Sequence, residues 1–193
     1  MNPSIERSSS SRSRSECAEA FAKRPIVLLR EFVVPPAAEG MYVATRRFSA
    51  HRVTCGDARV SWTERGIDSL SPEAEFFRSA DCLQKVSPFL DGPATFREVR
   101  CWTSEYGLGE YINPHVDRAG DIQMVLCVRA TAVDNGGSLC VRYCNEGESY
   151  HLTAGDAVLF RATDVEHWTV PLVPTPDDPH PERVVICARY FRA

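Results

Sequence analysis

The sequence predicts a mainly β protein of the sandwich or jelly-roll type, with its helices confined to the N-terminal half. From about residue 96 to the C-terminus the chain consists of short runs rich in β-branched and aromatic residues. Turn sequences such as Asp134-Asn135-Gly136-Gly137 and Ala154-Gly155-Asp156 separate these runs. The strand-like character then continues without interruption to the end of the chain. The predicted strands are 96–104, 110–117, 122–129, 138–143, 149–152, 157–161, 167–173 and 183–191.

The N-terminal half is expected to add one strand and two helices. Residues 25–34 form a β-rich run that Pro35-Pro36 stops. A proline followed by small and apolar residues predicts a helix over 36–47. A second helix is predicted from Ser71, which can cap its N-terminus, to Leu90, because apolar residues recur between them at helical spacing. This apolar stripe is expected to pack against the sheet.

The length of 193 residues fits one compact domain. Residues 1–15 are rich in Ser and Arg with hardly any large apolar side chain, so we expect a flexible tail there and a single domain over 16–193. A transit peptide is the alternative interpretation of this tail. Five prolines in the stretch 171–181 predict an irregular excursion before the last strand.

Charge and composition exclude several classes of protein. The net charge of −4 supplies no general attraction for a phosphate backbone, so nucleic acid is not an expected partner. No apolar run reaches the roughly 18 residues of a membrane span, and the start lacks the apolar stretch of a secretory signal, so we expect a cytoplasmic protein without membrane contact. The eight cysteines are scattered and are expected to be reduced. Cys140 and Cys144 form an isolated CxxxC pair, too few ligands for a structural zinc site.

The segment His115-Val116-Asp117 carries the chemical signal. In an extended strand residues two apart project from the same face, so His115 and Asp117 can share one metal ion. His167 lies 52 residues further on (167 minus 115) and supplies a third ligand. Two imidazoles and one carboxylate leave the opposite side of an ion open, which suits iron(II) oxygen chemistry. The alternatives are a chance HxD pair, or zinc in a hydrolase or a non-catalytic metal-binding barrel.

Arg183 opens the last predicted strand, 16 residues after His167 (183 minus 167). An arginine among β-branched neighbours near a metal is costly unless it is paired, and its planar fork matches a carboxylate. We therefore predict that Arg183 holds a bound acid. Arg189, on the same face of that strand, is the alternative residue for this role.

The order and spacing of these motifs resemble those of the iron(II)- and 2-oxoglutarate-dependent dioxygenase superfamily, especially its prolyl-hydroxylase-like branch. The likeness covers about residues 95 to 193. The matching segments are 106–117, Asn135-Gly136-Gly137-Ser138-Leu139, 154–160, His167 and Glu182-Arg183. The gap between His167 and Arg183 is longer than this branch usually shows, because of the excursion at 171–181.

The resemblance implies a double-stranded β-helix that holds iron(II) through His115, Asp117 and His167. It implies that 2-oxoglutarate chelates the metal while Arg183 pairs with its distal carboxylate. Reaction with O2 would convert this co-substrate to succinate and CO2 and hydroxylate a C–H bond of the primary substrate. Tyr111 is a candidate second contact of the co-substrate, although it stands four residues before His115 where the related hydroxylases place a tyrosine three before.

The superfamily shares its co-substrate site and varies its substrate loops, so the primary substrate is inferred from weaker signals. We expect a small molecule, either an amino acid or a specialised metabolite, with a peptidyl residue as the second class. The arginines near the predicted site favour an anionic group. Arg118, Gln123 and Trp168 flank the predicted metal strands and are candidate substrate contacts. The spacing of Arg183 and Arg189 also resembles the nucleic-acid dealkylases of the superfamily, against which the negative net charge argues.

Overall fold

The computed structural model describes residues 13–90 and 95–193, which form two β-sheets and a set of helices. The helical elements are α1 (Arg14–Lys23), α2 (Pro35–Thr45), α3 (Pro72–Arg78), α4 (Ala80–Val86) and the 3-10 turns η1 (Ser87–Phe89) and η2 (Val133–Asn135). The strands are β1 (Ile26–Leu29), β2 (Ala50–Cys55), β3 (Asp57–Ile67), β4 (Phe96–Tyr106), β5 (Ile122–Arg129), β6 (Leu139–Tyr143), β7 (Glu146–Tyr150), β8 (Ala157–Arg161), β9 (Glu166–Thr169) and β10 (Arg183–Arg192).

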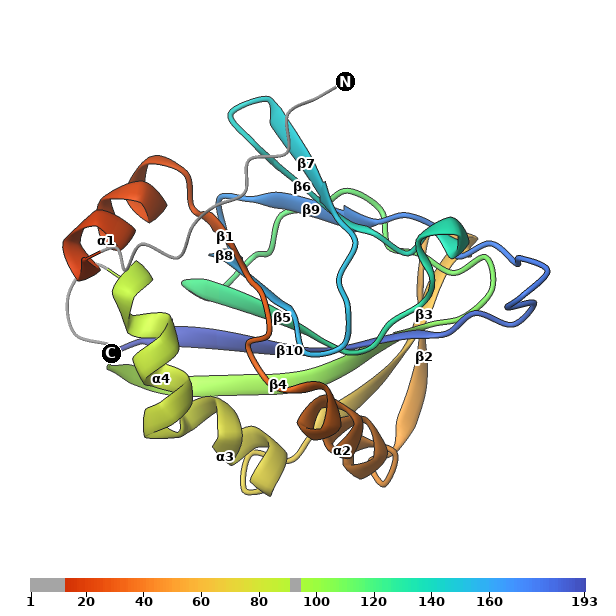
Figure 1. Cartoon of the computed structure of the whole chain (residues 1–193), viewed down its shortest axis with the longest axis horizontal. Helices are drawn as coiled ribbons and strands as arrows, with labels where there is room; N and C mark the ends of the chain where they lie inside the picture. Colours follow the sequence, from red (N-terminus) through yellow and green to blue (C-terminus); the bar gives the residue numbers. More distant parts are fainter. Residues whose placement is uncertain (1–12, 91–94) are drawn as a thin grey trace.

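The two sheets face each other, as a jelly roll requires. The large sheet has the strand order β1-β8-β5-β10-β4-β3-β2, and the small sheet has the order β7-β6-β9. Every strand pair within them is antiparallel. The small sheet lies above the middle of the large one (Figure 1), and side chains such as Val141 of β6 and Val125 of β5 share one apolar cluster between them. The predicted mainly β fold is confirmed.

Strand β10 lies at the centre of the large sheet, between β5 and β4. Its side chains alternate between two environments, as the period of two in a strand dictates. One set belongs to the apolar cluster beneath the helices: Val184, Ile186, Ala188 and Tyr190. The other set faces the space between the sheets: Arg183, Val185, Cys187 and Arg189.

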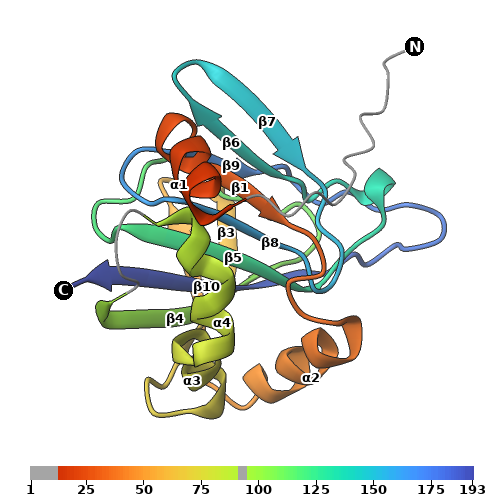
Figure 2. The same ribbon diagram turned by 60° about the vertical axis from the view of Figure 1, so that its left-hand side comes forward.

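The helices cover the outer face of the large sheet (Figures 1 and 2). Helix α1 begins at Ser13, whose hydroxyl accepts a hydrogen bond from the amide of Glu16, while the Glu16 carboxylate accepts one from the amide of Ser13. Phe77 of α3 and Val86 of α4 are fully buried against the sheet. The predicted packing of the apolar helical stripe is therefore confirmed.

The two predicted helices differ in how well they match. Helix α2 agrees with the prediction at 36–47 within the usual uncertainty of helix ends. The helix predicted from Ser71 to Leu90 is instead divided at Ser79, whose backbone is extended with ψ 151°. The Ser79 hydroxyl accepts a hydrogen bond from the amide of Cys82 at 3.2 Å, so this residue ends α3 and caps α4. The periodicity of apolar residues alone did not reveal the break.

Two predictions about strands were wrong. Strands β2 and β3 were not predicted, because β2 is a largely exposed edge strand and β3 is rich in polar residues. The predicted strand at 110–117 is not a regular strand, and only His115 in it forms a bridge. The preceding Pro114 has no amide hydrogen with which to extend a ladder.

The ends and connections of the chain follow the sequence in part. Residues 1–12 of the predicted tail lie outside the described residues. The last two residues of the predicted tail, Arg14 and Ser15, belong to α1. The excursion at 171–181 is irregular as predicted, with Leu172 buried inside it. All eight cysteines are free thiols. Among the described residues no helix has both the length and the apolar character needed to cross a membrane.

Asp156 fastens the turn before β8 to the end of β1. Burial alone would raise the pKa of its carboxyl, but hydrogen bonds from Glu31, Thr153 and Arg30 outweigh burial and hold the pKa below its usual range. The Glu31 amide donates to Oδ1 at 3.0 Å, and the Thr153 amide and hydroxyl donate to Oδ2 at 3.0 and 2.8 Å. A group with a lowered folded pKa stabilises the fold above its unfolded pKa and loses this contribution as the pH falls through the folded value.

We expect Asp156→Asn to lower the free energy of unfolding by about 1–3 kcal/mol at pH 7, because an amide cannot accept the same charge-assisted bonds. The difference from the wild type should shrink as the pH falls below about 4. Urea unfolding at pH 7 and pH 3 measures both effects. Asp134→Asn, at an exposed carboxylate on η2, is the control. A difference that does not change with pH would contradict the role assigned to the charge.

Candidate metal centre

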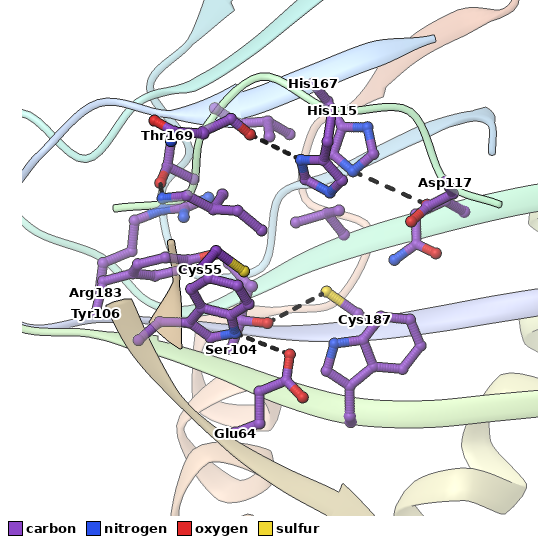
Figure 3. A pocket seen from close by; sticks show the side chains of 18 of the residues that line it. Cys55, Glu64, Ser104, Tyr106, His115, Asp117, His167, Thr169, Arg183 and Cys187 are labelled. Atoms are coloured by element: carbon purple, nitrogen blue, oxygen red, sulfur yellow. Dashed lines mark hydrogen bonds and ion pairs between the residues drawn. The ribbon is translucent and has the colours of Figure 1, made fainter. Parts of the chain in front are cut away.

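A cavity of about 560 Å³ lies between the large and small sheets. Its walls come from β3, β4, β5 and β10 on one side and from β6, β9 and the loop at 112–117 on the other. The inward-facing residues of β10 line it along its length, from Arg183 to Arg189. Figure 3 looks into this cavity.

The structure brings His115, Asp117 and His167 together at one end of the cavity. One ligand atom from each side chain lies within 4.8 Å of the others. The two histidines form an isolated antiparallel bridge, in which the His115 amide donates to the His167 carbonyl at 3.1 Å and the His167 amide donates back at 2.9 Å. The loop therefore acts locally as a short strand beside β9, which places both imidazoles on the same side (Figure 3).

Backbone carbonyls orient both imidazoles. Nδ1 of His115 lies 2.8 Å from the carbonyl oxygen of Asn113, and Nδ1 of His167 lies 3.1 Å from that of Val165. A carbonyl only accepts, so each Nδ1 carries the proton and each Nε2 presents a lone pair. Burial, together with the neighbouring His115, lowers the pKa of His167 to about 4. His167 is therefore a neutral imidazole at physiological pH.

Asp117 has one paired and one unpaired oxygen. Oδ1 accepts from Nη2 of Arg189 at 2.5 Å, whereas Oδ2 is buried without a hydrogen-bond partner. Oδ2 lies 3.9 Å from Nε2 of His167, on the side of the two imidazoles. A buried carboxylate oxygen without a donor is costly unless a cation meets it. The donor set therefore fits a divalent metal ion.

Arg189 is held in place by three contacts besides Asp117. Its Nε donates to Oε1 of Gln123 at 2.9 Å, and its guanidinium lies 4.9 Å from the ring centre of Trp102. Its stem also packs against Gly120, where a Cβ atom would come within 2.6 Å of the arginine. Gly120 itself has φ +96°, so a side chain there would be strained in any case. Arg189 is thus committed to the loop that carries Asp117.

Arg183, in contrast to Arg189, has no partner for its terminal nitrogens. It is 3% exposed, and both Nη1 and Nη2 are buried without a partner. Its guanidinium lies 5.6 Å from the ring centre of Tyr106, the residue that faces it on β4. A buried, unpaired guanidinium calls for an anion, and its fork matches a carboxylate. Of the two candidate arginines, Arg183 is the one whose terminal nitrogens are both buried without a partner.

The other predicted contacts are divided between the cavity and its surroundings. Gln123 lines the cavity. Tyr111, Arg118 and Trp168 do not line it. Arg118 is exposed, and Trp168 follows His167 directly in β9 and so points to the opposite face, where Arg142 lies 5.7 Å from its ring centre. These three assignments remain predictions.

Several lining residues were missed. Trp62 and Glu64 lie on the unpredicted strand β3, while Trp102, Ser104 and Tyr106 lie on β4. The last three alternate with a period of two, and this pattern was the one available signal that they share the face of a strand. Nothing in the sequence indicated that β3 would pair with β4.

The chain resembles solved structures in its fold, whereas the comparisons of its sequence find no match. No family model and no curated protein matches the chain. A prolyl-4-hydroxylase from Pseudomonas putida superposes with a TM-score of 0.73 at 14% identity, over 94% of this chain and 100% of that one. A 2OG-Fe(II) oxygenase family protein from Burkholderia pseudomallei gives 0.72 at 16% identity, over 95% and 93%. The α-ketoglutarate-dependent epimerase SnoN from nogalamycin biosynthesis gives 0.71 at 13% identity, over 93% and 83%.

The chain has the fold of the 2OG-Fe(II) oxygenases. The jelly roll of this fold accounts for the two sheets and for the cavity between them. Within it, the three candidate metal ligands lie together at one end of the cavity. A closed structural zinc site would need a fourth protein ligand, and the described residues place only three together.

Proposed function

We propose that this chain is an iron(II)- and 2-oxoglutarate-dependent oxygenase that hydroxylates a C–H bond of a small molecule. One observation carries the proposal. A three-ligand centre with an unpaired carboxylate oxygen shares a cavity with a buried guanidinium that has no anion. The first feature calls for a cation and the second for an acid, and a metal with a chelating dicarboxylate satisfies both.

Each residue then has a defined task. His115 and His167 bind iron through Nε2 and Asp117 binds it through Oδ2, since a backbone carbonyl engages Nδ1 of each histidine and Oδ2 is buried without a hydrogen-bond partner. Arg183 pairs with the distal carboxylate of 2-oxoglutarate. When bound, iron and 2-oxoglutarate supply O2 activation, with oxidative cleavage of the co-substrate to succinate and CO2 and transfer of one oxygen atom to the substrate.

Other residues position and protect this centre. Arg189 fixes the direction of the Asp117 carboxylate by binding Oδ1, which leaves Oδ2 for the metal. Val125, Val185 and Cys187 form an apolar wall beside the ligands and exclude water from this part of the cavity. Such exclusion strengthens the electrostatic interactions within a site.

The size of the cavity favours a small substrate. About 560 Å³ holds a co-substrate and a second small molecule. SnoN belongs to a biosynthetic pathway of a specialised metabolite, which supports the same class, and the similarity to a prolyl-4-hydroxylase keeps a peptidyl residue as the second candidate. A net charge of −4 argues against a nucleic-acid substrate.

Anaerobic reconstitution with iron(II) and 2-oxoglutarate tests the proposal. The wild type is expected to develop the weak visible charge-transfer band of the iron-bound 2-oxoglutarate chelate, because the centre leaves adjacent positions open. On exposure to air, succinate should form slowly even without the primary substrate. Glu98→Gln, at an exposed carboxylate of β4, should behave like the wild type. The absence of a band, with zinc retained after chelator treatment, would favour the zinc-binding alternative.

A further inference from the structure

Glu64 places a carboxylate in the cavity that is not part of the proposed iron centre. It lies on β3, and its side chain lines the wall that belongs to the large sheet. His167 comes from the small sheet, and Figure 3 shows Glu64 across the cavity from His115 and His167. The carboxylate therefore faces the same chamber as the metal ligands, from the opposite wall.

The pairing of β3 with β4 determines what surrounds Glu64. The residue faces Ser104, whose small side chain leaves room above the strand, and Trp102 lies one position further along the same face. Trp62 stands two residues before Glu64, and its indole Nε1 donates a hydrogen bond to Oε1 at 2.8 Å. This bond fixes the carboxylate through Oε1, so a ligand would meet Oε2, beside the mostly exposed side chain of His51.

The charge of Glu64 is not met by either arginine of the cavity. Arg189 is paired with Asp117, and Arg183 is reserved for an acid. In the part of the chain that the structure describes, Glu64 forms no ion pair with an arginine or lysine. Its contact with an ionisable base is to His51, whose Nε2 lies 3.5 Å from Oε2 on a side chain that is 60% exposed. The Glu64 side chain itself is 25% exposed, so its charge is partly removed from water.

We propose that Glu64, with Trp62 and Trp102 beside it, forms a subsite for a cationic amine group of the primary substrate, a proposal that rests on the proposed function. A carboxylate accepts hydrogen bonds from an ammonium group and repels a substrate carboxylate. Indole surfaces pack against the alkyl part of an amine and attract its charge. The subsite implies a cationic substrate group in place of the anionic group predicted from the arginines. Arg189 binds Asp117 and Arg183 is assigned to 2-oxoglutarate, so neither is available to the primary substrate.

Three probes of similar size test the sign of the charge: cyclohexylmethylamine, which is an ammonium at neutral pH, cyclohexylmethanol and cyclohexanecarboxylate. Binding to the chain can be followed by intrinsic fluorescence, since two of the three tryptophans line the cavity. For ligands of this size a dissociation constant on the order of millimolar is expected. The ammonium should bind about tenfold more tightly than the alcohol. With 2-oxoglutarate present to occupy Arg183, the carboxylate should give no saturable change.

Glu64→Gln tests the residue itself. Glutamine can still accept the bond from Trp62, so the variant is expected to fold, which circular dichroism checks. Its affinity for the ammonium should fall to that for the alcohol, while its affinity for the alcohol should not change. A loss caused by altered structure would weaken both probes. Glu98→Gln should keep the tenfold preference of the wild type.

Two results would overturn the subsite: equal binding of ammonium and alcohol by the wild type, or an unchanged preference in Glu64→Gln. Absence of any saturable response to the ammonium would do the same. The band of iron(II) and 2-oxoglutarate, recorded with the same preparations, separates this proposal from the proposed function. If the charge-transfer band forms but the ammonium is not preferred, the proposed subsite is wrong and the proposed oxygenase function stands. If the ammonium is preferred but no band forms, the proposed oxygenase function is wrong and the amine-binding subsite stands.

Discussion

Replacing His167 by alanine is expected to reduce iron(II) affinity by more than about a hundredfold and to bring succinate formation down to background. Loss of a group that merely orients a metal ligand costs about 10- to 100-fold in affinity, so loss of a ligand should cost at least as much. His167 is also the buried member of the pair, and a water molecule that replaced it would be a poorer donor. Equilibrium dialysis of iron(II) under argon and a succinate assay measure the two effects.

The matched control for His167→Ala is His180→Ala, because His180 is exposed and lies in the excursion at 171–181. Circular dichroism and thermal unfolding should show that both variants fold. Some loss of stability is expected for His167→Ala, since its ring packs 4.7 Å from that of Phe160. Asp117→Ala should repeat the loss of iron and of turnover. Normal turnover in either ligand variant would show that the metal centre is wrongly assigned.

Arg183→Gln is expected to raise the 2-oxoglutarate concentration needed for half-maximal band formation by about 10- to 100-fold. A charge-assisted hydrogen bond contributes about 1.5–3 kcal/mol, and glutamine removes the charge and the two-pronged fit. Iron binding in the absence of 2-oxoglutarate should stay close to that of the wild type, because Arg183 contacts none of the three ligands. Arg183→Lys should recover only part of the loss, since an ammonium cannot form the paired bonds.

Arg189→Gln distinguishes the two arginines. Its guanidinium binds Asp117, so its loss should weaken iron(II) binding and leave the requirement for 2-oxoglutarate nearly unchanged at saturating metal. The contrast between the two variants is sharper than either result alone. If Arg189→Gln raises the 2-oxoglutarate requirement and Arg183→Gln does not, the roles assigned to them are reversed.

The parts of the fold that could be predicted are those whose apolar residues form a recognisable run or periodic pattern in the sequence. The helix at 36–47 and the strands of the second half carry such patterns, and the structure confirms them, with the exception of 110–117, which is a loop. Strands β2 and β3 carry none, because β2 is exposed at the edge of the sheet and its partner is rich in charged residues. Their pairing is a long-range event that no local periodicity records.

The candidate site divides in the same way. His115, Asp117 and His167 could be selected because their residue types and their order are distinctive, even though the expected strand around Asp117 is a loop. His115 and Asp117 still lie close together, since an extended loop keeps the alternation of side chains over three positions. Glu64 could not be selected, because its role depends on which strand lies beside β4 and on which neighbouring charges are already paired.

Arg183 and Arg189 have separate tasks on the same strand, β10, and this limits where the chain can tolerate insertions and deletions during evolution. The position of Arg183 depends on its pairing with Tyr106 in β4 and not on the number of residues that follow His167. The connection at 171–181 can therefore lengthen or shorten by insertion and deletion without displacing the guanidinium. An insertion of one residue within β10 would be far more damaging. It would turn apolar side chains such as Val184 toward the cavity and would direct the charged ones into the apolar layer beneath the helices.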